Sequence, residues 1–135
     1  MRGETPGLVP NESVELVFRD TGAFGVPFEL EDGRGYTIEV TAILRGISTT
    51  NTPLVLSIQQ LFSVRRDGGV TTIAGAGTQE VIGDGDLPWT LTASVRAAPD
   101  RFALVASTGG MQTRLRVVSK VEFTEVFNPV IPIIL

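Results

Sequence analysis

The segment YTIEVTAILR, residues 36–45, decides the fold class of this sequence. From Tyr36 to Leu44, every second residue is apolar, and most of the residues between them are polar or charged. Successive side chains of a β-strand point to opposite faces of the sheet, so this period places one set in a core and the other in solvent or on a partner. The segment is therefore predicted to be a long strand, and Ile43 is the large apolar residue that falls on its outward face.

The same period of two recurs along the chain. It is present in SVELVFRD (13–20), LVLSIQQLFSVRR (54–66), WTLTASVRA (89–97), RFALVAS (101–107) and TRLRVVSKVEFTEV (113–126). In the short run RFALVAS, Phe102, Leu104 and Ala106 share one side. Turn-forming stretches such as EDGRG, STTNTP, RDGG, GDGD and STGG separate the runs. This spacing predicts an all-β fold, an antiparallel β-sandwich or barrel.

The two ends of the chain differ from this body. Residues 1–12 are rich in glycine, proline and polar groups and are predicted to be an extended N-terminal arm. Residues 13–126 form the predicted sandwich or barrel domain, since 135 residues fit one domain. Residues 127–135 are predicted to be an extended apolar C-terminal tail, because Pro129 and Pro132 prevent a helix and suit a central strand poorly.

The composition removes several kinds of chemistry. The chain has no cysteine and no histidine, so it has neither disulfides nor thiolate metal sites, and Ser-His and Cys-His nucleophile systems cannot be assembled from it. The sequence therefore predicts a protein that is not an enzyme, with no catalytic residues, no metal site and no cofactor.

Charge and hydropathy argue against nucleic acid and membrane as partners. The net charge is −4 and the eleven basic residues are scattered, whereas a nucleic-acid binder normally has a concentrated basic face. No secretory signal and no stretch of about 20 apolar residues is present, so neither export nor a membrane span is predicted. We expect synthesis in a cytoplasm, with no nucleic-acid or membrane partner.

Carboxylates supply the one enzymatic alternative. Glu80, Asp84 and Asp86 lie close together in the sequence and could serve a small glycan hydrolase, which needs two carboxylates at a defined separation. GDGD is more simply explained as a turn, because aspartate and glycine both suit one. The glycine-rich stretch 75–83 is predicted to be a hairpin loop, since no helix pattern follows to form a phosphate site.

The arginines and the tryptophan have structural explanations. Arg65-Arg66 and the pair Arg114 and Arg116 could contact a phosphate or a partner's carboxylates. A solvated strand face with mixed charges explains them without a ligand. Trp89 has the parity of the core residues, so a core anchor is predicted, with a carbohydrate platform as the alternative.

The apolar ends carry the predicted partner contacts. Several Ile or Leu side chains left in water would form an aggregation-prone surface, so they are expected to be buried, either on this chain's own sheet or on another subunit. Burial on another subunit is favoured, because an extended segment can lie along a neighbouring subunit. The predicted partner-binding residues are Leu8, Val9, Val130, Ile131, Ile133, Ile134 and Leu135.

Three stretches also resemble a known family. They are FSVRRDGG (62–69), TTIAGAGTQEVIGDGDLPWTLTASV (71–95) and DRFALVASTGGMQTRLRVVSKVEFTEV (100–126). From Gly35 to Val126 the layout resembles a small β domain of bacteriophage virion proteins, which occurs in tail fibres, tail spikes, baseplate parts and capsid-decorating proteins. Members often carry a tryptophan in the last strand, where this chain has Val117 or Val118.

The resemblance implies a sandwich or barrel module, usually a homotrimer, built into a phage particle made in a bacterial cytoplasm. It transfers no active-site residue. The leading hypothesis is a capsid decoration protein that binds the major capsid protein or another virion protein. The alternative is a tail-fibre or tail-tip module that binds host glycan or another tail protein.

Overall fold

The computed structural model describes residues 2–5, 13–16, 29–111 and 113–129. Its strands are β1 (Arg2–Thr5), β2 (Ser13–Glu15), β3 (Arg34–Ser48), β4 (Pro53–Asp67), β5 (Val70–Ala76), β6 (Glu80–Gly83), β7 (Thr90–Arg96), β8 (Arg101–Ser107) and β9 (Thr113–Phe127). Every strand pair is antiparallel, which confirms the predicted all-β class. No helix in the described ranges is long and apolar enough to cross a membrane.

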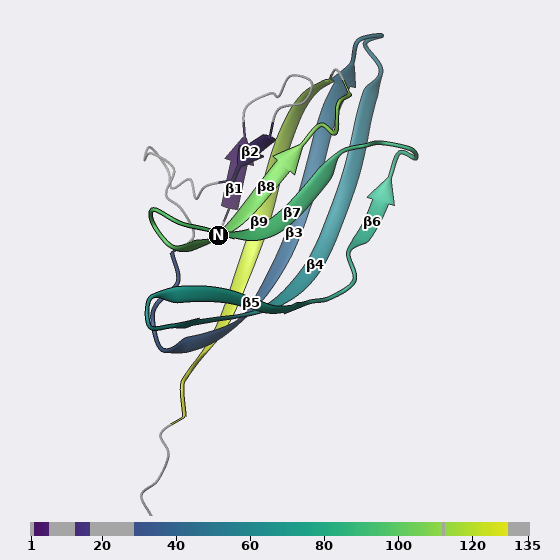
Figure 1. The fold of residues 1–135 in the computed structure, drawn as a ribbon. Coiled ribbons are helices and arrows are strands. Elements are labelled where there is room, and N and C mark those ends of the chain that lie inside the picture. The colour runs from purple at the N-terminus through teal and green to yellow at the C-terminus, as the bar shows by residue number, and fades with distance from the viewer. Residues whose placement is uncertain (1, 6–12, 17–28, 112, 130–135) are drawn as a thin grey trace, which may run out of the picture.

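The strands form two sheets that enclose one core (Figure 1). The larger sheet has the order β1-β9-β3-β4-β5, and β6 pairs with β4 further along the same edge. The long strands β9, β3 and β4, of 15 residues each, run side by side as its centre. The smaller sheet has the order β2-β8-β7 and lies across the larger one. The architecture is therefore the predicted sandwich.

The predicted parity of the long strands is confirmed. In β3, Ile38 and Leu44 are fully buried, and Ile38 stands in register between Phe62 of β4 and Phe123 of β9. Partners in register share a face of the sheet, so a single parity is buried across all three strands. The remaining parity faces away from the core, with Ile43 half exposed.

Trp89 fills the space above a glycine of β3. The indole is 4% exposed, and a Cβ added at Gly46 would lie 2.7 Å from two of its ring carbons. A side chain at position 46 would therefore displace the ring. The prediction that Trp89 is a core anchor is confirmed, and the carbohydrate-platform alternative is wrong.

Strand β8 is buried more completely than its sequence pattern indicates. The alternation placed Phe102, Leu104 and Ala106 on one side, but Ala103 and Val105 are buried as well. β8 is the central strand of the smaller sheet, between β2 and β7. A strand covered on both faces loses the polar positions that reveal a half-buried one.

Three short strands, β1, β5 and β6, lie at the edges of the larger sheet and were not predicted from the sequence patterns. Residues 2–5, within the predicted arm, form β1 and pair with β9, for example Thr5 with Val117. The stretch 75–83 was predicted as one hairpin loop, but it contains the end of β5 and all of β6. Each of these short strands contributes backbone hydrogen bonds to an edge of the larger sheet.

Candidate functional site

The residues predicted to bind a partner at the chain ends lie outside the described residues. They are Leu8, Val9, Val130, Ile131, Ile133, Ile134 and Leu135. Their role therefore stays a prediction. The described surface offers two other regions with concentrated functional groups, one at the turns and one on the larger sheet.

Asp84, one of the three carboxylates considered for glycan hydrolysis, is engaged at the β4 edge. Asp84 accepts a hydrogen bond from the Val55 amide at 2.8 Å through Oδ2, and its own amide donates to the Val55 carbonyl at 2.9 Å. Asp86 has a φ of 61° in the following turn, so the turn prediction for GDGD is confirmed. Glu80 begins β6, where its side chain is exposed.

No group of three or more His, Cys, Asp or Glu side chains in the described part of the chain could hold a metal ion.

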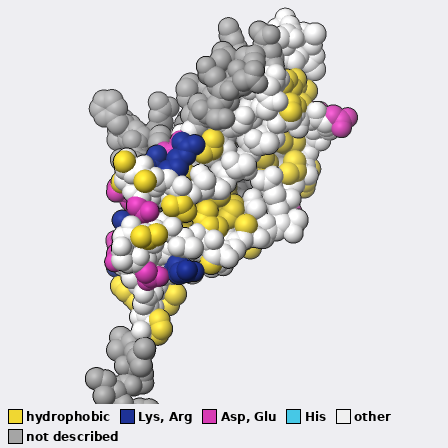
Figure 2. Space-filling view, viewed as in Figure 1, with side chains coloured by type: hydrophobic (Ala, Val, Ile, Leu, Met, Phe, Trp, Pro, Cys, Tyr) yellow, Lys and Arg dark blue, Asp and Glu magenta, His cyan; other side chains and the backbone are white. Residues whose placement is uncertain are grey.

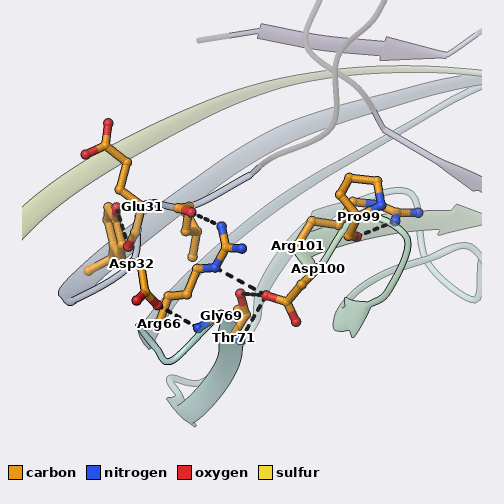
Figure 3. Close-up of polar contacts among 10 residues, drawn as sticks. Glu31, Asp32, Arg66, Gly69, Thr71, Pro99, Asp100 and Arg101 are labelled. Carbon is orange, nitrogen blue, oxygen red and sulfur yellow. Dashed lines mark hydrogen bonds and ion pairs between the residues drawn. The ribbon is translucent and has the colours of Figure 1, made fainter.

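Charged side chains gather where the β4–β5 and β7–β8 turns meet, on the face shown in Figure 2. At this end Asp100 accepts two hydrogen bonds from Thr71, at 3.0 Å from the amide and 2.5 Å from the hydroxyl (Figure 3). Nε of Arg66 lies 3.5 Å from the same carboxylate oxygen, and Nη1 of Arg66 donates a hydrogen bond to the Leu30 carbonyl. Asp100 thus fastens the smaller sheet to β4 and β5 of the larger sheet.

Arg101 makes a second set of contacts beside this one. Its Nε lies 3.1 Å from both carboxylate oxygens of Glu15, and its terminal nitrogen donates to the carbonyls of Ala97 and Pro99. These bonds join β2, β8 and the β7–β8 turn. Most donors and acceptors of this charged end therefore pair with one another and hold the turns in place, while the buried Nε of Arg66 contacts Asp100 as an ion pair without a hydrogen bond.

We expect Asp100→Asn to lower the free energy of unfolding by about 2 kcal/mol, because it removes the charge from the acceptor that Thr71 and Arg66 share. Urea denaturation at neutral pH measures the loss. Asp32→Asn is the matched control, since Asp32 is exposed and accepts one backbone bond, from Gly69 at 2.8 Å. Equal losses for the two variants would contradict the fastening role.

The second region is the side of the larger sheet that faces away from the smaller sheet, here called the outer face. It comprises Thr37, Glu39, Thr41, Ile43, Arg45 and Ile47 of β3, Val55, Ser57, Gln59, Leu61 and Ser63 of β4, and Arg116, Val118, Lys120, Glu122 and Thr124 of β9. This set is the non-core parity of the three longest strands.

The outer face exposes large apolar side chains. Ile43 is 49% exposed, Ile47 51% and Leu61 49%. Arg45 stands between the two isoleucines on β3, opposite Arg116 of β9, and forms no hydrogen bond or ion pair within the described part of the chain. An arginine flanked by half-exposed aliphatic groups offers a partner an apolar contact and a side chain of a type enriched in protein interfaces.

Further along the same strands the outer face becomes acidic. Glu39 stands opposite Glu122 and accepts a hydrogen bond from Gln59 at 2.9 Å. Lys120 lies 2.5 Å from Glu122, and this hydrogen bond lowers the pKa of Glu122 and raises the pKa of Lys120. The predicted charge-mixed strand face is confirmed for Lys120 and Glu122. Glu39 accepts its hydrogen bond from a neutral side chain, and its charge also contributes to raising the pKa of Lys120.

The sequence prediction for the other arginines is confirmed only in part. Arg65 is exposed and lies 3.7 Å from Asp67, as a solvated strand face requires. Arg66 instead points into the charged end described above. The side chain of Arg114 lies outside the described structure.

A hollow of about 310 Å³ lies at the far end of the outer face. Gly35 leaves it open, and the hydroxyls of Thr37, Ser63 and Thr124 stand in one row across it. A glycan site would normally add exposed aromatic rings. Among the described aromatic residues, Phe127 is largely exposed, at 67%, and the guanidinium of Arg34 lies 4.3 Å above its ring.

Comparisons with known proteins identify no family. No protein-family profile matches the sequence, and no curated protein matches it significantly. Among solved structures, the fold is similar to the tailspike protein of Acinetobacter baumannii phage AM24, with a TM-score of 0.35 and 9% sequence identity. The similarity covers 70% of this chain and 20% of the tailspike, so this chain spans about a fifth of that protein's length. Likeness at this level assigns neither a family nor a function.

Proposed function

We propose that this chain is a non-enzymatic structural module of a bacteriophage virion, and that it joins subunits through the outer face. The observation that carries the proposal is the outer face itself, where Ile43, Ile47 and Leu61 are about half exposed around Arg45. The opposite face of the same strands is packed into the core, so the outer face is the face of these strands that a partner can contact.

The virion setting of the proposal rests on the sequence resemblance. The glycine-broken segment 71–95 and the closing pattern 100–126 resemble the small β domains of phage virion proteins. Two locations follow from that resemblance: a tail module that binds another tail protein, and a decoration protein on the capsid shell.

Host-glycan binding by a tail module is supported less well. The rings of Trp89 and Tyr36 are buried, and the hollow beside Gly35 is lined mainly by hydroxyl and aliphatic groups. Stacking of sugars on aromatic faces is therefore not available there. Protein contacts remain the proposed activity at either location.

Antibody labelling of particles of the phage that encodes this chain, viewed by electron microscopy, tests the setting. Label on tails or on shells is expected. Abundant chain in the lysate without any label on particles would refute the proposal.

The joining surface has its own test. The triple variant Ile43→Ser, Ile47→Ser, Leu61→Ser should reduce the chain's occupancy in particles at least tenfold, because hot-spot truncations each cost more than about 1 kcal/mol. Val95→Ser on β7, 40% exposed, is the matched control and should leave occupancy unchanged. Quantitative mass spectrometry of purified particles measures both. Full occupancy by the triple variant would remove the outer face from the proposal.

A further inference from the structure

We infer that the partner on the outer face is a second copy of this chain, related by a two-fold axis, with Arg45 of each copy paired to Glu39 of the other. This inference rests on the proposed function, because it names the partner of the same surface. It follows from the order of charges along β3, from the apolar residues between them and from the size of the face.

The charges of β3 are arranged so that the strand complements its own reverse. Arg45 and Glu39 lie on the same outer face, six residues apart, which is about 20 Å along the strand. Ala42 lies midway between Arg45 and Glu39. A two-fold axis that lies in the interface plane and crosses the strands at the level of Ala42 places Arg45 of each copy over Glu39 of the other copy. Such an isologous interface satisfies both pairs with one arrangement.

Neither group forms an ion pair among the described residues that the two-fold pairing would break. Arg45 forms no ion pair among the described residues, and Glu39 accepts its hydrogen bond from the neutral side chain of Gln59. The nearby opposite-sign neighbours, Lys120 and Glu122, already pair with each other. Glu39 acts on Lys120 as well, but Glu122 holds the short contact to that ammonium group, so the two-fold axis gives Glu39 a direct cationic partner in Arg45 of the other copy.

The same axis also brings apolar side chains together. Ile43 lies one residue from the axis, so the two copies of Ile43 meet near the centre of the interface. Val55 and Leu61 stand opposite Arg45 and Glu39 on β4, and the axis therefore places Val55 of one copy over Leu61 of the other. Ile43 near the axis, with Val55 and Leu61 beside the charged pairs, gives the interface its apolar contacts, and the charged pairs lie further from the axis.

The face is large enough for such a contact. From the level of Thr37 to that of Ile47 it is about 33 Å long, and across the three long strands and the short strands beside them it is about 20 Å wide. Contact over this whole area would bury at most roughly 700 Å² per copy, near the size of a standard protein interface.

Charge-swap variants of the full chain test the inference. Sedimentation velocity over a concentration series should show a dimer for the unmodified chain. Arg45→Glu and Glu39→Arg should each raise the dimer dissociation constant at least tenfold, because each places like charges face to face twice. The double variant Arg45→Glu, Glu39→Arg should return it to within about threefold of the original value, since the pairs are restored in reverse.

Glu31→Arg is the matched charge control. Glu31 is exposed on the loop before β3, where it pairs with Arg34, and its replacement changes the net charge as Glu39→Arg does without touching the outer face. Circular dichroism of every variant establishes that the sheets are intact. A monomer at all concentrations, a trimer, or a dimer that the single swaps leave unchanged would overturn the inference.

Cross-linking gives a second, independent readout. The chain has no cysteine, so Ile43→Cys and Thr90→Cys each introduce a single thiol. A short bis-maleimide should link the Ile43→Cys copies rapidly and leave the Thr90→Cys copies, altered on the smaller sheet, as monomers. Absence of the Ile43→Cys product would also overturn the inference. Particles that still contain the charge-swap variants would show that the virion role stands without self-pairing.

Discussion

Replacing Phe102 by alanine should lower the free energy of unfolding by about 3–5 kcal/mol, the range measured for truncating a fully buried phenylalanine. Phe102 is 0% exposed at the start of β8, and its ring meets that of Phe62 edge to face, with centroids 5.5 Å apart. The contact joins the central strand of the smaller sheet to β4 of the larger one. The loss combines the removed apolar contact with a cavity between two sheets that cannot close fully around it.

Urea denaturation measures this loss, and Val95→Ala is the matched control. Val95 is the direct partner of Phe102 in the β7–β8 register but is 40% exposed, so its truncation should cost less than about 1 kcal/mol. The double variant Phe62→Ala, Phe102→Ala should be less destabilised than the sum of the singles by about 1 kcal/mol, because the ring pair is counted twice in that sum. A Phe102→Ala loss near that of Val95→Ala would show that the two sheets do not pack at this point.

Periodicity in the sequence predicted the long strands but not the edges. Ile38 and Leu44 could be assigned to the core because polar residues alternate with them, and Trp89 followed the same rule. β6 could not be found in this way, since all four of its residues are exposed and it depends on pairing with β4. A short edge strand is defined by its neighbour's free hydrogen-bonding groups, which a local pattern does not contain.

The candidate site was readable only in part for a related reason. Parity alone placed Ile43 and Arg45 on an outward face. The position of Arg45 between Val55 and Arg116 depends on the register of β3 with β4 and β9, which is set over the whole sheet. The bond between Thr71 and Asp100 likewise spans 29 residues. Local periodicity identifies which side chains point outward, and tertiary pairing decides which of them meet.

The turn between β8 and β9 provides the second large effect, because Gly109 combines a left-handed backbone with a close contact. Its φ is 63°, and a Cβ at this position would lie 2.1 Å from the carbonyl oxygen of Pro88. An L-residue there must bear the cost of left-handed φ, about 1–2 kcal/mol, and must also push the Pro88 backbone away. Gly109→Ala should therefore lower the free energy of unfolding by about 2–5 kcal/mol in total.

Gly69→Ala separates the two contributions. Gly69 has a φ of 76° in the β4–β5 turn, but a Cβ there would meet no atom within 4 Å, so only the backbone cost of about 1–2 kcal/mol is expected. Thermal and urea denaturation of the pair measure the difference. The Gly109 turn carries the chain from β8 of the smaller sheet to β9 of the larger one. The difference between the free-energy losses of Gly109→Ala and Gly69→Ala therefore measures how tightly Pro88, just before Trp89, packs against this turn. Equal losses in the two variants would mean that the segment before Trp89 yields to an added methyl group, and that the crossing between the sheets is held by the core side chains alone.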